Sequence, residues 1–137
     1  MTQIAVNPFQ LTDCLFTVES DNYEAHVSKV EFVPTSTSAQ FKGMTPSAAY
    51  TFAGTPTWVC NLTFAQDWNT PDSLSRYLFE HTGESIDVTF EPQKGGPAIT
   101  ATLTAQPGSI GGDVDAVATS SVALGVVGKP VLEPLAP

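Results

Sequence analysis

Between residues 58 and 90, the spacing of apolar side chains changes from alternate positions to helical spacing and back again. Residues 58–65 alternate, which places apolar side chains on one face of a strand. Leu74, Tyr77 and Leu78 then fall at helical spacing. Residues 86–91 alternate once more. The pattern predicts a strand, one helix over about residues 71–82, and a second strand.

The ends of this helix have their own signals. Thr70 is the expected N-cap, Pro71 suits the first helical position, and Asp72 suits the positive end of the helix dipole. Gly83, just after His81, suits the left-handed residue that closes a helix. Since no other stretch has comparable helical spacing, we expect strands elsewhere.

Alternation elsewhere predicts further antiparallel strands. In residues 23–33 the alternation slips near Ser28 and Lys29, which predicts a β-bulge. A Gly/Pro turn joins the strand at 86–91 to one at 99–105, and a last strand region is expected at 113–127. The other expected strands cover residues 12–19 and 49–53.

About seven strands and one helix indicate a mainly β fold: a two-sheet antiparallel β-sandwich or barrel with one flanking α-helix. We expect one domain over residues 1–137, with an N-terminal arm at 1–11 and a C-terminal tail at 129–137 that neighbours would order. Residues 34–47 are rich in Ser, Thr, Pro and Gly and are expected to form a long loop. Phe41 and Met44 within it either fold back onto the core or contact a partner.

Composition and charge disfavour two classes of function, nucleic-acid binding and membrane association. Five basic and fourteen acidic residues give a net charge of −9, which disfavours nucleic-acid binding and is accounted for by solubility alone. Apolar runs are far shorter than the ~20 residues of a membrane span. No signal peptide is visible at the N-terminus, so we expect cytoplasmic synthesis and no membrane association.

A search for catalytic chemistry finds little. His26 and His81 are isolated, no nucleophile, zinc or phosphate-binding motif is present, and Asp113 with Asp115 is too small a set for calcium. The two cysteines, Cys14 and Cys60, lie at core-face positions and are expected to be buried free thiols. We therefore expect no catalytic residues, no metal, no cofactor and no enzymatic activity.

Several short pieces resemble the major tail tube protein of bacteriophages with long, non-contractile tails. They are WNTPDSLSRYL at 68–78, HTGE at 81–84, VTFEP at 88–92, IGGDV at 110–114, TSSV at 119–122 and VGKP at 127–130. The resemblance implies a virion protein, assembled in the cytoplasm of a bacterial host, that forms hexameric rings stacked into the tail tube. It also implies tape-measure, initiator and terminator proteins as partners, and DNA that passes through the lumen without specific binding.

The resemblance assigns roles to particular residues. Inter-ring contacts would come from Phe41, Lys42 and Met44 in the long loop. Contacts from the N-terminal arm and C-terminal tail would come from Phe9, Leu11, Lys129 and Leu132. Acidic side chains that face the lumen would repel passing DNA, although a position on the outer surface is equally expected for them. The candidates are Glu19, Glu24, Asp87 and Glu91.

Two other readings remain. An Ig-like β-sandwich binding module, such as a capsid decoration protein, would have the same fold but an aromatic cluster on an exposed face or at loop tips. Most aromatic residues here alternate into expected core faces, which counts mildly against that reading. A small enzyme that uses His26 or His81 is third.

Overall fold

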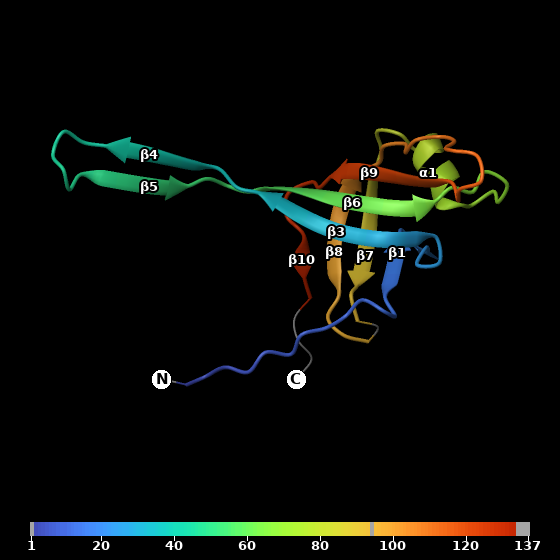
Figure 1. Cartoon of the computed structure of the whole chain (residues 1–137), viewed down its shortest axis with the longest axis horizontal. Coiled ribbons are helices and arrows are strands. Elements are labelled where there is room, and N and C mark those ends of the chain that lie inside the picture. Colours follow the sequence, from blue (N-terminus) through green and yellow to red (C-terminus); the bar gives the residue numbers. More distant parts are fainter. Residues whose placement is uncertain (1, 94, 134–137) are drawn as a thin grey trace.

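The computed structural model describes residues 2–93 and 95–133 (Figure 1). The chain is mainly β, with 44% of residues in strands and one helix, and its antiparallel sheets confirm the predicted β-sandwich. Residue 1 of the N-terminal arm and residues 134–137 of the tail lie outside the described residues. In chain order the elements are β1 (Leu15–Val18), β2 (Asp21–Asn22), β3 (Val27–Thr35), β4 (Ser38–Lys42), β5 (Ala49–Ala53), β6 (Thr57–Ala65), α1 (Leu74–Glu80), β7 (Ser85–Glu91), β8 (Ile99–Thr104), β9 (Thr119–Gly125) and β10 (Val131–Leu132).

The strands form two main sheets and one separate hairpin. A five-stranded sheet has the order β10-β8-β7-β1-β2, and a three-stranded sheet has the order β3-β6-β9. β4 and β5 pair only with each other. Figure 1 shows this hairpin extending from one end of the three-stranded sheet, while α1 lies at the other end.

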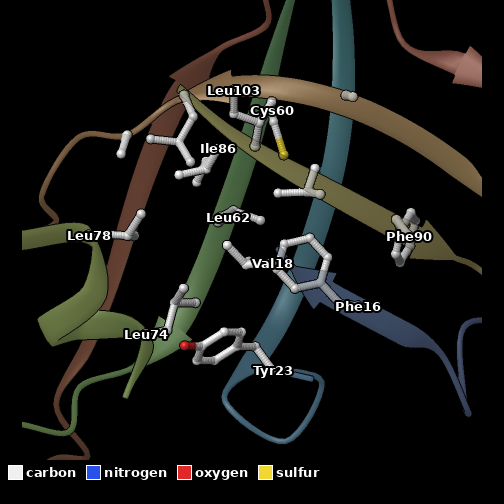
Figure 2. Packing of buried hydrophobic residues seen from close by; sticks show 14 of the residues in the cluster. Phe16, Val18, Tyr23, Cys60, Leu62, Leu74, Leu78, Ile86, Phe90 and Leu103 are labelled. Carbon is white, nitrogen blue, oxygen red and sulfur yellow. The ribbon is translucent and has the colours of Figure 1, made fainter. Parts of the chain in front are cut away.

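The apolar alternation in the sequence builds the core. Along β6, Cys60, Leu62 and Phe64 are buried, and along β7, Ile86 and Val88 are buried, as predicted. All five belong to one buried cluster that also contains Leu74 and Leu78 of α1. Figure 2 shows Leu62 and Ile86 on the side of the core that faces these two helix residues. The predicted bulge is also confirmed, because the pairing of β3 with β6 shifts register between Val27 and Lys29.

Leu74 and Leu78 hold α1 on the core, where both are fully buried. The helix is shorter than predicted, and its N-cap is Ser73 rather than Thr70, so Pro71 lies before it. The reason is local. The Asp67 carboxylate accepts the backbone N–H groups of Asn69 and Thr70 at 3.1 and 3.2 Å, which holds this segment in a turn.

The Ser73 hydroxyl then accepts the backbone N–H of Arg76 at 3.4 Å. Hydrogen bonds from the Thr70 hydroxyl and from the backbone of Thr70 and Asn69 lower the pKa of the Asp67 carboxyl. At the other end His81 is the C-cap, and Gly83 has a φ of 87°. The left-handed role predicted for Gly83 is confirmed.

Two strands begin later than predicted. β3 starts at Val27 because residues 23–26 form a turn, closed by a bond from His26 N to Tyr23 O of 2.9 Å. β9 starts at Thr119 because the preceding residues form a loop, in which Asp115 has a φ of 68°. The prediction of a strand region from residue 113 was therefore wrong over its first six residues.

The sequence-based expectation for residues 34–47 was also wrong in part. β3 continues to Thr35, and β4 occupies Ser38–Lys42, so only residues 43–48 form the turn before β5. The C-terminal tail likewise contains a short strand, since Val131 pairs with Thr100 and Leu132 with Ile99. This part of the tail is therefore ordered by its own chain.

Candidate assembly surfaces

The hairpin of residues 36–56, which we call the projecting hairpin, is exposed along both of its strands. All ten residues of β4 and β5 are exposed. In a globular domain a strand normally buries at least one face, because alternation otherwise leaves apolar side chains in water. The projecting hairpin therefore has a face that none of the described residues covers.

The two faces of the projecting hairpin differ in chemistry. Register places Phe41 opposite Tyr50, with ring centroids 6.4 Å apart, and Ala39 opposite Phe52. These four side chains form the aromatic face, on which Phe41, Tyr50 and Phe52 are 61%, 56% and 62% exposed. The other face carries Ser38, Gln40, Lys42, Ala49, Thr51 and Ala53.

The sequence-predicted contact residues of this region sit on different parts of the hairpin. Phe41 lies on the aromatic face, Lys42 on the opposite face, and Met44 in the turn, where it is fully exposed. Sequence reasoning missed Tyr50 and Phe52, which it assigned to a separate short strand. Their partnership with Phe41 becomes visible only once β4 is recognised as a strand.

The edge strands of the two main sheets differ in how far other parts of the chain cover them. In the five-stranded sheet, β2 covers part of the β1 edge and β10 covers part of the β8 edge, while a Val127 N to Thr102 O bond of 2.7 Å covers more of β8. In the three-stranded sheet, no described strand pairs with the outer edge of β3 or of β9. β9 contains no charged residue and no proline, so it lacks the usual protection against pairing with another chain.

Three of the four acidic candidates lie together on the five-stranded sheet. Asp87 and Glu91 alternate with the buried residues of β7, so they are on its outward face. Glu19 joins them: its backbone N–H donates to Asp87 O at 2.7 Å, and its carboxylate accepts Asp87 N–H at 3.1 Å. Glu24 lies elsewhere, with its carboxylate 3.5 Å from the backbone nitrogen of Phe16.

The contact residues predicted in the N-terminal arm lie apart from those predicted in the C-terminal tail. Phe9 and Leu11 are about half exposed and line a groove of about 440 Å³ together with Val30 and Phe90. Lys129 is exposed, and Leu132, in β10, is 68% exposed. The N-terminal arm thus lies beside the start of β3, whereas the C-terminal tail lies at the opposite edge of the five-stranded sheet.

A further exposed apolar surface was not found from the sequence. The loop of residues 109–118 presents Ile110, Val114 and Val117, which are 65%, 90% and 82% exposed. The alternation of Val114 and Ala116 had been interpreted as a buried strand face. The Gly111-Gly112 pair is the sequence feature that indicates a loop here, and in the structure Gly111 has a φ of 95°.

The contacts and burial of His81 and of the two cysteines are as follows. The His81 ring stacks on Tyr77 with centroids 4.2 Å apart, and its Nδ1 lies 2.9 Å from Tyr77 O. Cys14 is half-buried and Cys60 is buried, both as free thiols. Within residues 2–93 and 95–133, no group of three potential metal ligands comes together.

Among the described residues, no helix has the length and apolar character needed to cross a membrane. No protein-family model matches the chain, and no curated protein matches it.

Proposed function

We propose that this chain is a structural subunit that assembles with copies of itself into hexameric rings, and that the rings stack into a phage tail tube through which DNA is ejected. The observation that carries the proposal is the projecting hairpin, whose aromatic face is left uncovered by the part of the chain that the structure describes. The sequence pieces that resemble tail tube proteins support the same reading and supply the ring and tube geometry.

The size of the aromatic face supports a role in association. Each aromatic side chain has roughly 150–250 Å² to bury, so three of them at more than half exposure leave on the order of 400 Å² of apolar surface in water. Burial of that area contributes about 10 kcal/mol at roughly 25 cal/mol per Å². Association costs roughly 4–15 kcal/mol in lost freedom, so the hairpin needs further contacts beside it.

The open edges of the three-stranded sheet supply such contacts. β9 of one copy can pair with β3 of the next, which is a head-to-tail contact that generates a ring when the rotation closes. Closure removes the two open edges in every copy. In this arrangement the three-stranded sheet forms the continuous inner barrel.

The same arrangement changes the prediction for the lumen wall. The outward face of the three-stranded sheet carries Asn61, Thr63 and Ser121, together with Lys29 and Glu31, whose charged groups lie 3.8 Å apart. Such a wall is close to neutral and offers DNA phosphates few cations to bind. Glu19, Asp87 and Glu91 then lie on the outer wall of the tube.

A binding module such as a capsid decoration protein remains the second candidate. An exposed aromatic cluster was the feature expected for it, and the projecting hairpin has one. In that case the aromatic face docks on another protein, and the chain stays monomeric when alone.

Electron microscopy and light scattering of the concentrated protein distinguish the two. We expect rings and tubes from the unsubstituted chain, and loss of tubes in a Phe41→Ser, Phe52→Ser double variant. The matched control, Gln40→Ser with Thr51→Ser on the opposite face, retains them. Monodisperse monomers at every concentration, with no growth on addition of phage tail initiator complexes, would overturn the tube proposal and favour the binding module.

A further inference from the structure

Another exposed apolar surface is the loop of residues 109–118, which we call the loop platform. Ile110, Val114 and Val117 are its most exposed side chains, and Val114 is 90% exposed. Aliphatic side chains so exposed on one short loop are unusual unless the loop contacts a partner.

The loop platform is held in shape by hydrogen bonds from one side chain. The Gln66 amide nitrogen donates to Gly111 O at 2.8 Å and to Thr119 O at 3.0 Å, and its oxygen accepts Gly111 N–H at 2.9 Å. The Ser120 hydroxyl donates to Ser109 O at 2.6 Å. The apolar side chains are therefore presented by a fixed backbone, which lowers the entropic cost of docking.

The loop platform and the projecting hairpin lie at opposite ends of one strand. β6 begins at Thr57, directly after the hairpin, and ends at Ala65, next to Gln66. Its nine residues span roughly 30 Å at about 3.3 Å each. Figure 1 shows the same separation, with β4 and β5 at one end and α1 and the start of β9 at the other.

We propose that the aromatic face of the projecting hairpin in one copy docks on the loop platform of a second copy in the adjacent ring. This inference rests on the proposed function. The eight residues from Thr37 to Met44, joined by seven steps of about 3.3 Å, reach roughly 23 Å beyond the sheet, which is enough to overlap a neighbouring domain end. Because the two surfaces differ, the contact is head-to-tail and can repeat without limit.

Charge agrees with this pairing only at the rim of the contact, because Lys42 lies on the hairpin face opposite the aromatic face, beside the turn that carries Met44. Lys42 is the only charged residue between positions 36 and 56. The loop platform carries Asp113 and Asp115, both exposed, and neither forms an ion pair with a residue that the structure describes. Opposite charges at the rim of an interface favour the correct orientation more than they add affinity.

The area explains why single copies would not stack by themselves. Apolar patches of this size bury on the order of 800 Å² in total, below the ~1,200 Å² of a stable specific interface. Six such contacts in parallel between two rings add up, because each later contact forms within an existing complex. Ring formation is therefore required before stacking.

Disulfide trapping tests the contact in assembled protein. One copy carries Met44→Cys and a second carries Val114→Cys, both in a Cys14→Ser background, and they are mixed, assembled and oxidised. We expect cross-linked pairs of the two variants at least tenfold above the control pair, Met44→Cys with Ser85→Cys on the outward face of β7. The three altered positions other than Cys14 are exposed, so the fold tolerates them.

Two results would overturn the inference, and they differ. Tubes that form normally but cross-link no more than the control pair would exclude this docking site and leave the proposed function intact. Absence of rings and tubes in the unsubstituted protein under every condition would overturn the proposed function and this inference together.

Discussion

Gly54 donates its backbone N–H to the carbonyl oxygen of Thr37 at 2.7 Å, in the gap between two pairs of strands. On one side of this bond β3 pairs with β6, and on the other β4 pairs with β5. The bond is therefore the point at which the projecting hairpin is joined to the three-stranded sheet.

Substitution at this point is expected to redirect the hairpin. A Cβ on Gly54 would collide with the Thr37 hydroxyl and lie 3.0 Å from its carbonyl oxygen. We expect Gly54→Val to lower tube formation at least tenfold while the midpoint of thermal unfolding stays within about 2 °C, because the site is exposed. Thr55→Ala is the control. Normal assembly of Gly54→Val would show that the direction of the hairpin is unimportant.

Neighbouring positions of α1 should differ in their contribution to stability. Leu78 is fully buried, so Leu78→Ala is expected to lower the free energy of unfolding by about 2–5 kcal/mol. Phe79 is 54% exposed and its ring lies at a right angle to that of Trp68, with centroids 6.2 Å apart, so Phe79→Ala should cost about 1 kcal/mol or less. Urea unfolding measures both. Equal losses would mean that α1 does not sit on the core as described.

Gly108 is expected to be required for packing under the loop platform. A Cβ there would lie 2.9 Å from the Ser120 Cβ and 3.1 Å from the ring of Phe64, which is fully buried. Gly108→Ala should therefore cost about 1–3 kcal/mol of unfolding free energy through overpacking. Gly112→Ala, where a Cβ meets nothing within 4 Å, is the matched control. A smaller loss for Gly108→Ala than for its control would contradict this packing.

The two thiols should differ in reactivity and in their dependence on pH. Burial raises the pKa of the Cys60 thiol from 9.0 to about 12. Because the folded-state pKa is raised, its contribution to stability is complete below pH 9 and is lost as pH rises toward 12. Between pH 8 and pH 10.5 the free energy of unfolding should fall by about 2 kcal/mol more in this protein than in a Cys60→Ala variant, given roughly 1.4 kcal/mol per pH unit.

Urea unfolding at pH 8 and pH 10.5 measures this difference. A thiol reagent at pH 8 should label Cys14, which is half-buried, well before Cys60. Rapid labelling of both thiols in the folded protein would show that Cys60 is accessible.

The open edge of β9 should be sensitive to added charge. Ala123 is exposed on this edge strand, so Ala123→Lys is expected to prevent ring formation without changing the unfolding midpoint by more than about 2 °C. Ser85→Lys, on the exposed face of the five-stranded sheet, should leave rings intact. Sedimentation velocity measures ring formation, and rings in Ala123→Lys would exclude β9 as the edge that joins neighbouring copies.

The sequence predicted those elements whose burial follows a simple period. Alternation identified Leu62 and Val88 as core residues, and the slip near Ser28 identified the bulge. Such signals work because each of these side chains packs within its own chain. The helix boundary failed because the Asp67 side chain bonds to nearby backbone groups, a local competition that spacing does not reveal.

The candidate surfaces were harder to predict for a different reason. Phe41 and Phe52 alternate like core residues, yet they lie on a hairpin with no sheet beneath it. Val114 was assigned to a strand, although Gln66, which lies distant in the sequence, holds it in a loop. An apolar residue that contacts another copy has the same local sequence pattern as one that contacts its own core.

The position of the projecting hairpin at one end of β6 and of the loop platform at the other gives any stack built from this contact a direction. One terminus of the stack presents unoccupied hairpins, and the other presents unoccupied platforms. A protein that binds the terminus with free hairpins must present a surface like the loop platform. A protein that binds the other terminus must present a surface like the aromatic face of the hairpin. Two distinct capping partners follow from the asymmetry of a single subunit.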